Sequence, residues 1–316
     1  MALLKVDNLS VTYATARGPL RAVDQVSFIL EKGQSMGLVG ESGSGKTTIG
    51  TAIMGLLPSN AEITSGTIEF HQTDLVSSPP TVLQNVRWKH IAMIFQAAMN
   101  ALNPIQRVGQ QIAEAIQFHE PGISGAEAKD RVADLFSMVG IPGHRCNDYP
   151  HQYSGGMRQR AVIAMALSCS PDVIIADEPT TALDVIVQDQ ILETIRSLQQ
   201  KLGIGILFIS HDISVVADVC HMIGVMYAGE LVEVGTREEV FLSPAHPYTR
   251  SLLAAHITLS ATHRPKPIPG RSPDLVTPEM GCRFCSRCDC SGETCMIEAP
   301  QWRILSDTHK IKCCQG

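Results

Sequence analysis

The sequence has 316 residues, enough for one large domain or two modest ones. Hydrophobic residues make up 44% and charged residues 18%, which is typical of a globular protein with a sizeable core. The net charge of −6 argues against nucleic acid as a partner, and no apolar run approaches the roughly 20 residues that a membrane-spanning helix needs.

The N-terminal part of the chain predicts antiparallel strands. Residues 1–7 lack the charged and apolar regions of a signal peptide, so we expect a protein that is made and kept in the cytosol. Residues 3–10 and 22–30 have the pattern of antiparallel strands. The short apolar run 36–40 that follows is typical of a strand covered on both faces, as in a parallel sheet flanked by helices.

A glycine-rich loop, residues 40–47, lies between that run and a helical pattern over residues 48–57. Its sequence GESGSGKT fits the phosphate-loop pattern G-x-x-x-x-G-K-[ST] in the strand–loop–helix context that the pattern requires. Glycines let backbone N–H groups face phosphate oxygens, and the helix N-terminus adds positive potential. We expect Lys46 to contact the β- and γ-phosphates and the Thr47 hydroxyl to ligate Mg²⁺. The ATP-binding residues predicted here are Gly40, Ser42, Gly43, Ser44, Gly45, Lys46, Thr47 and Thr48.

The pattern becomes helical between about residues 100 and 153. Residues 108–119 and 126–139 read as amphipathic helices separated by Pro121 and Gly122. We interpret this stretch as a helical insertion into the sheet domain.

An apolar strand over residues 173–177 ends in two carboxylates, Asp177 and Glu178. Asp177 at the strand end suits Mg²⁺ held through water, and Glu178 could orient or deprotonate the water that attacks the γ-phosphate. Such a pair alone is more often a solvated loop start, but the phosphate loop upstream favours the functional interpretation. Residues 206–210 predict a further strand, and residues 223–234 predict a hairpin that turns around Ala228 and Gly229.

The C-terminal part of the chain is rich in cysteine. Five prolines within residues 262–278 indicate a linker, and seven of the ten cysteines follow it between Cys282 and Cys314. In a reducing cytosol such a cluster favours a metal or iron–sulfur site over disulfides.

Residues 153–160, YSGGMRQR, resemble the signature motif LSGGQxQR of ABC transporter ATPases, with Tyr and Met in place of Leu and the first Gln. The motif is a second phosphate-binding helix start, in which the serine caps the helix and the glycines let the backbone approach an anion. In this family two ATPase domains meet head to tail, with each ATP between one phosphate loop and the other chain's signature motif. The signature residues implied here are Ser154, Gly155, Gly156 and Met157.

The resemblance covers essentially the whole chain and implies its fold and domains. We expect an α/β fold: an ABC-type P-loop ATPase with a RecA-like mixed sheet, an antiparallel β subdomain, an inserted helical subdomain and a small cysteine-rich extension. The ATPase domain would span residues 1–256, with the helical subdomain at about 97–158. Residues 257–316 would form the C-terminal region of oligopeptide transporters.

The resemblance also assigns single residues. Tyr13 resembles the aromatic residue that stacks on adenine, although a structural strand tyrosine remains an alternative. Gln96 resembles the glutamine that senses Mg²⁺, the attacking water and the transmembrane subunit, and His211 resembles the histidine that contacts the γ-phosphate. Asp184 lies in a loop that contacts the second ATPase. The implied catalytic residues are Glu178, His211 and Gln96, and the implied Mg²⁺ ligands are Thr47, Gln96 and Asp177.

Residues 95–104 and 245–253 resemble the FQDPMTSLNP and HPYTxxLL stretches of the peptide and nickel importer subfamily. This implies ATP hydrolysis that powers import of di- or oligopeptides, or of a related solute such as a nickel complex. The implied partners are a second, related ABC ATPase (a homodimer stays open), two transmembrane permease subunits and an extracytoplasmic solute-binding protein. The protein would lie peripherally at the cytoplasmic face of the inner membrane.

The tail resembles the cysteine region of that subfamily, where four cysteines bind a [4Fe–4S] cluster in some members. Chemistry permits four thiolates to hold such a cluster, but a Cys₄ zinc site or free thiols remain alternatives. Residues 282–288 also imitate part of a ferredoxin pattern, and Cys285, Cys290 and Cys314 are extra, so the ligand set is not unique. Matching residue by residue gives Cys282, Cys288, Cys295 and Cys313 as ligands.

A rival interpretation is a soluble ABC-type ATPase that acts on nucleic acid or ribosomes. Such proteins usually carry two tandem cassettes or long insertions, whereas this chain has one cassette, a short insertion and an acidic balance. A pure binding module is a third class, and the intact Asp177, Glu178 and His211 argue against it.

Overall fold

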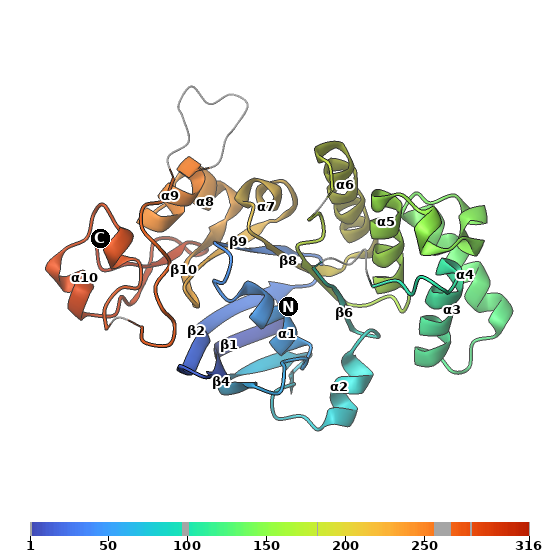
Figure 1. Ribbon diagram of the computed structural model, residues 1–316, viewed down its shortest axis with the longest axis horizontal. Helices are drawn as coiled ribbons and strands as arrows, with labels where there is room; N and C mark the ends of the chain where they lie inside the picture. The colour runs from blue at the N-terminus through green and yellow to red at the C-terminus, as the bar shows by residue number, and fades with distance from the viewer. Residues whose placement is uncertain (1, 97–100, 182, 256–266, 279, 316) are drawn as a thin grey trace. The chain divides into compact units, whose positions relative to one another are not determined.

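The computed structural model describes residues 2–96, 101–181, 183–255, 267–278 and 280–315 (Figure 1). The chain forms two compact units. The helical unit comprises residues 31–34 and 78–207, and the sheet unit comprises residues 2–30, 35–77 and those from 208 onward. The chain passes from the helical unit to the sheet unit within strand β8 (Gly205–Ser210).

The sheet unit contains a four-stranded sheet in the order β2-β1-β4-β5. Its strands are β1 (Ala2–Thr15), β2 (Gly18–Glu31), β4 (Ala61–Phe70) and β5 (Thr73–Asp74). The strands predicted at residues 3–10 and 22–30 are confirmed but are longer than predicted. Asn8 and Gln25 adopt positive φ angles of 49° and 51°, and the register of β1 against β4 shifts after Asp7. Such an irregularity lets a strand bend and continue rather than end.

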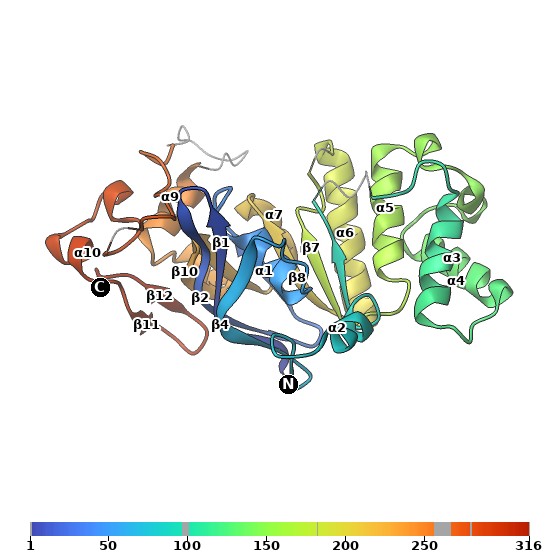
Figure 2. The same ribbon diagram turned by 60° about the horizontal axis from the view of Figure 1, so that its bottom comes forward.

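The second set of strands in the sheet unit carries the phosphate loop. β3 (Ser35–Val39) is buried throughout and runs parallel to β9 (Met222–Tyr227). β9 then forms a hairpin with β10 (Glu230–Thr236) around Ala228 and Gly229, as predicted. The C-terminal segment extends this sheet, because β12 (Lys310–Lys312) pairs with β10 and β11 (Trp302–Ile304) pairs with β12 (Figure 2).

Short helices accompany these strands in the sheet unit. α1 (Lys46–Ile53) follows β3, and α7 (Ile213–Val219) follows β8. The later elements are α8 (Arg237–Leu242), α9 (Pro247–Ala255), the 3-10 turn η4 (Cys285–Arg287) and α10 (Glu293–Ile297).

The helical unit combines two parallel strands with a group of helices (Figure 1). β6 (Ile91–Ile94) runs parallel to β7 (Val173–Asp177), and every residue of both strands is buried. The two predicted amphipathic helices are present as α3 (Val108–His119) and α4 (Gly125–Met138), and a capping box of Ser124 and Glu127 begins α4. The remaining elements are α2 (Pro80–Val86), η2 (Gly143–Asn147), η3 (Pro150–Gln152), α5 (Gly155–Ala166) and α6 (Val185–Leu202). Every helix in the described parts of the chain is too short or too polar to cross a lipid bilayer.

Candidate nucleotide site

The phosphate loop of the sheet unit joins β3 to α1, and its geometry explains its glycines. Gly40 has φ 152°, and a Cβ atom there would lie 2.0 Å from the Met226 carbonyl oxygen. Gly45 has φ 100°, and its Cβ would lie 2.3 Å from the Ala22 carbonyl oxygen. Neither position has room for a side chain, so only glycine permits this curled loop.

Lys46 occupies the centre of the curl. Its buried Nζ donates hydrogen bonds to the carbonyl oxygens of Gly40 (2.8 Å) and Glu41 (2.9 Å) and to Ser44 Oγ (3.1 Å). The ammonium group is therefore held where the loop would wrap a phosphate. Thr47 directly after it is exposed.

Tyr13, the predicted adenine-stacking residue, lies beside the first turn of α1. Its hydroxyl is 3.4 Å from Thr48 Oγ1, and its side chain is half-buried. The structure therefore joins Tyr13 to the phosphate-loop helix, while its role toward adenine stays a prediction.

Glu41, the second residue of the loop, has partners that the sequence did not reveal. Arg287 engages both of its carboxylate oxygens at 2.9 Å, and Ser272 Oγ donates to Oε2 at 2.8 Å. The Glu41 backbone N–H donates to the hydroxyl of Tyr248 in α9 at 3.0 Å. Burial alone would raise the pKa of Glu41, but the hydrogen bonds from Arg287 and Ser272 outweigh it and hold that pKa below its usual value.

The acidic strand end lies in the helical unit, where β7 delivers the two carboxylates. Asp177 is buried with 1% exposure. Glu178 has a positive φ of 47°, which is strained for a residue with a side chain. One oxygen of its carboxylate, Oε2, accepts hydrogen bonds from Gln96 Nε2 and Thr181 Oγ1, both at 2.9 Å. The structure thus brings two predicted catalytic residues together and adds Thr181, three residues after Glu178.

The signature motif begins α5 in the same unit. Ser154 caps the helix, because its Oγ accepts from the Met157 backbone N–H at 3.3 Å. A Cβ on Gly156 would lie 2.6 Å from Cγ1 of Val187 in α6, so this glycine lets the two helices approach. Asp184 caps α6 by accepting from the Val187 N–H at 3.0 Å. The packing of α5 on α6 therefore places the signature motif beside Asp184.

The tyrosine that replaces the usual leucine of the signature motif also has a structural explanation. Tyr153 is buried, and its hydroxyl donates to the Arg145 carbonyl oxygen at 2.7 Å. A buried hydroxyl with a partner carries little penalty, so the substitution is tolerated at this position.

His211 lies in the sheet unit, directly after β8. Its side chain is exposed, and the next residue, Asp212, caps α7 by accepting from the Ser214 and Val215 N–H groups. The predicted residues are thus distributed over both units. Tyr13, the phosphate loop and His211 belong to the sheet unit, whereas Gln96, Asp177, Glu178, the signature motif and Asp184 belong to the helical unit.

The four predicted cluster ligands, Cys282, Cys288, Cys295 and Cys313, belong to the sheet unit. The Cys282 N–H donates to the Cys295 carbonyl oxygen at 2.7 Å, which links two of these segments. Within the described residues, no three His, Cys, Asp or Glu side chains are arranged so that they could hold a metal ion.

The thiols of this region nevertheless share one electrostatic environment. Burial raises the pKa of Cys282 to about 12, and the nearby Cys314, Cys313 and Cys295 add to the shift. Burial also raises the pKa of Cys288, with contributions from Cys313 and Cys295 among others. Cys282 and Cys288 therefore both lie within electrostatic range of Cys295 and Cys313, but the described residues do not arrange these thiols as a metal-binding group.

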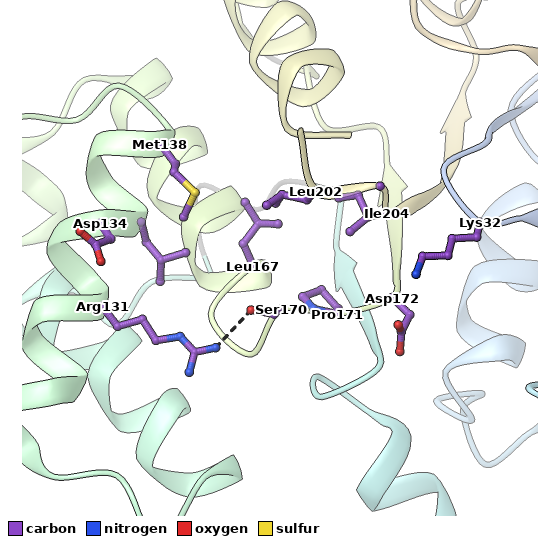
Figure 3. Close-up of a pocket in the computed structure, with 12 residues that line it drawn as sticks. Lys32, Arg131, Asp134, Met138, Leu167, Ser170, Pro171, Asp172, Leu202 and Ile204 are labelled. Atoms are coloured by element: carbon purple, nitrogen blue, oxygen red, sulfur yellow. Dashed lines mark hydrogen bonds between the residues drawn. The ribbon is translucent and has the colours of Figure 1, made fainter. Parts of the chain in front are cut away.

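A separate pocket of about 290 Å³ lies within the helical unit (Figure 3). Leu167, Ser170 and Leu202, near the ends of α5 and α6, form part of its wall, and Arg131 donates to Ser170 Oγ at 3.2 Å. None of the residues predicted for the nucleotide site lines this pocket.

Comparison with known protein families identifies the family to which the chain belongs. Residues 23–181 match the ABC transporter family, and residues 232–295 match the C-terminal region of oligopeptide/dipeptide transporters. The first match contains the phosphate loop, the signature motif and the acidic strand end. The chain therefore belongs to the ABC transporter family, and it is an ATPase of that family.

Individual relatives agree along nearly the whole chain. The dipeptide transport ATP-binding protein DppD of Bacillus subtilis is 46% identical over 316 residues, which is 98% of this chain and 94% of that protein. The oligopeptide transport ATP-binding protein OppD of Salmonella typhimurium is 43% identical over 301 residues, covering 94% of this chain and 89% of that protein. The predicted membership of the peptide importer group of ABC ATPases is confirmed.

A solved structure confirms the fold. A dimer of the ATP-binding cassette MJ0796 in a post-hydrolysis state, bound to ADP and Pi, matches with a TM-score of 0.67 and 27% identity. The match covers 74% of this chain and 98% of the cassette. The predicted α/β ABC-type ATPase fold is therefore correct.

Proposed function

We propose that this chain is the ATP-hydrolysing subunit of an importer for dipeptides or oligopeptides. The observation that carries the proposal is a match along nearly the whole chain, at 43–46% identity, to proteins named as dipeptide and oligopeptide transport ATP-binding proteins. The C-terminal family match over residues 232–295 agrees with it. A nickel complex is a weaker candidate, because both of these relatives are named for peptides. A soluble ATPase acting on nucleic acid or ribosomes is not favoured for the same reason.

The residues of the phosphate loop would bind the nucleotide. Lys46 would exchange its bonds to the Gly40 and Glu41 carbonyl oxygens for the β- and γ-phosphates. Thr47, Gln96 and Asp177 are the residues that would hold Mg²⁺, which when bound neutralises charge on the phosphates. The glycines would let backbone N–H groups of the loop face the same anion.

Glu178 would act as the general base. Gln96 and Thr181 donate to its carboxylate and orient it, and the carboxylate would accept a proton from the attacking water. His211 would contact the γ-phosphate from the sheet unit. Replacing the base should therefore stop turnover while nucleotide binding persists.

The partners are proposed on the same grounds. A second, related ABC ATPase would place its nucleotide against residues 154–157 and Asp184 of this chain. Two transmembrane permease subunits and an extracytoplasmic solute-binding protein would complete an importer at the cytoplasmic face of the inner membrane. In this scheme residues 1–256 form the ATPase domain, residues 97–158 its helical subdomain and residues 257–316 the C-terminal region.

We further propose that Cys282, Cys288, Cys295 and Cys313 hold a [4Fe–4S] cluster with a structural or regulatory role, since ATP hydrolysis needs no electron. The four thiolate ligand types support this proposal, whereas the described residues form no metal-binding group; zinc or free thiols are the alternatives. Anaerobic purification followed by iron and sulfide analysis tests it. Colourless, iron-free protein would contradict the cluster.

Transport is tested with the complete assembly in vesicles. The chain, its second ATPase, the two permease subunits and the solute-binding protein should drive ATP-dependent uptake of a radiolabelled dipeptide. Uptake should be lost with Glu178→Gln. Uptake of nickel but of no di-, tri- or longer peptide would contradict the proposed cargo.

A further inference from the structure

Arg287 connects the cysteine-rich C-terminal segment, residues 280–315, to the phosphate loop. It ends the 3-10 turn Cys285–Arg287, directly before Cys288, and its side chain is only 5% exposed. Its Nη1 and Nη2 donate to Oε2 and Oε1 of Glu41, each at 2.9 Å. A bidentate pair of this kind fixes the direction of the carboxylate as well as its charge.

Arg287 is itself held rigidly by its surroundings. Its Nε donates to the Pro269 carbonyl oxygen at 2.7 Å, and Nη1 also donates to the Tyr227 hydroxyl at 3.2 Å. The guanidinium lies over the Tyr227 ring, 5.6 Å from its centroid. A cation with this many fixed contacts loses little further freedom when it holds Glu41.

The backbone of Glu41 is fixed as tightly as its side chain. Its N–H donates to the Tyr248 hydroxyl, and its carbonyl oxygen accepts from Lys46 Nζ. Tyr248 packs on Tyr227 and Phe284, with ring centroids 4.6 and 5.3 Å away. The C-terminal segment therefore reaches one phosphate-loop residue through both an ion pair and an aromatic cluster.

The ion pair between Arg287 and Glu41 affects nucleotide binding through the charge of Glu41. A carboxylate at the second position of a phosphate loop would repel the triphosphate and compete with it for Lys46. Arg287 neutralises this carboxylate and turns it toward the C-terminal segment. Without Arg287, Glu41 would be free to pair with the lysine that the phosphates need.

We propose that Arg287 is a positioning residue of the nucleotide site, through which the C-terminal cysteine segment holds the phosphate loop in its nucleotide-binding form. Arg287 acts through Glu41 and touches no substrate. The affinity for Mg–ATP therefore depends on the folded C-terminal segment. This holds whatever solute the complete transporter carries.

Three variants of the full chain test this role by titration with Mg–ATP. Arg287→Gln should weaken binding at least about tenfold, since it leaves Glu41 unpaired beside Lys46. Glu41→Gln should bind more tightly than Arg287→Gln, because no competing carboxylate remains beside Lys46. The double variant should bind more tightly than Arg287→Gln alone. Arg303→Gln, an exposed position in the same tail, is the matched control and should bind like wild type.

The double variant separates positioning from general damage to the fold. Its Arg287 contacts to Pro269 and Tyr227 are lost just as in the single variant, so a purely structural role would leave it equally weak. Wild-type affinity of Arg287→Gln, or no recovery in the double variant, overturns the proposal. If Arg287→Gln does not fold, Arg287→Lys is tested instead, because it keeps the positive charge but cannot form the bidentate contact with Glu41. It should bind less tightly than wild type, and unchanged affinity would count against the proposal.

A second measurement uses the reciprocity of binding. If the C-terminal segment raises the affinity for ATP, ATP must stabilise that segment by the same factor. Amide hydrogen exchange of residues 282–290 should therefore slow when Mg–ATP binds to the wild type, and this protection should disappear in Arg287→Gln. Exchange that is unaffected by Mg–ATP in the wild type contradicts the coupling.

Discussion

The phosphate loop and the acidic strand end are the two chemically decisive regions of this ATPase, and they are stabilised very differently. The loop is fixed from within by Lys46 and from two distant segments by Tyr248 and Arg287. Glu178 at the strand end is only half-buried, has a strained backbone and accepts hydrogen bonds from the neighbouring side chains of Gln96 and Thr181. The difference teaches that the phosphate loop is preorganised by contacts with distant segments, whereas the predicted catalytic carboxylate is oriented by residues of its own unit on a strained backbone.

The largest expected effect concerns the catalytic side of this comparison. Glu178→Gln should lower ATP turnover by about 10²- to 10⁴-fold, since an amide cannot accept the proton of the attacking water. Nucleotide affinity should stay near that of wild type. Phosphate release and Mg–ATP titration measure the two quantities. Turnover at the wild-type rate would show that Glu178 is not the general base.

The next effect tests preorganisation of the loop. Gly40→Ala should destabilise the protein by about 2–4 kcal/mol and abolish tight nucleotide binding, because its Cβ would overlap the Met226 carbonyl oxygen. Gly43→Ala is the matched control. It also has a positive φ of 79° but nothing within 4 Å of the added Cβ, so it should cost only about 1–2 kcal/mol. Equal losses in thermal unfolding would mean that the close approach is unimportant.

A smaller effect probes how the C-terminal part supports the loop. Tyr248→Phe removes the hydroxyl that accepts the Glu41 N–H, and leaving this partly buried N–H without that partner should cost about 1 kcal/mol. Chemical denaturation measures this loss, and Mg–ATP binding should weaken with it. Unchanged stability and unchanged affinity would show that the loop does not need this support.

The smallest effect concerns the pH dependence of stability at Glu239 in α8, which accepts hydrogen bonds from Ser306 and Thr308 in the turn before β12. Burial would raise the pKa of Glu239, but hydrogen bonds from Ser306, Thr236 and Thr308 outweigh it and lower that pKa from 4.5 to about 2. A depressed pKa stabilises the fold above the ordinary value, and the stabilisation is lost as the pH falls through the folded value.

The advantage of wild type over Glu239→Gln should therefore be constant near neutral pH and should disappear between about pH 4.5 and pH 2. It should amount to about 1 kcal/mol or less, because solvent screens this site. Unfolding measured at a series of pH values tests the window. A difference that persists at pH 2 would mean that the contacts do not depend on the carboxylate charge.

The sequence by itself determined the features that depend on neighbouring residues. The order strand, glycine loop and helix predicted the site of Lys46, and the apolar run ending at Asp177 predicted β7 with its two carboxylates. The helix periodicity predicted α3 with the observed bounds. These patterns are local, because a few adjacent residues decide backbone conformation and burial.

Only the tertiary structure decided the contacts between distant residues. Arg287 and Glu41 are separated by 246 positions, and Tyr248 and Glu41 by 207. The position of Arg287 between Cys285 and Cys288 does not predict a contact with Glu41, because the phosphate-loop pattern accepts any residue at position 41. The pairing exists because β9 and β10 bring the C-terminal segment to the sheet that carries the loop, and long-range juxtapositions of this kind follow from the packed fold rather than from any local pattern.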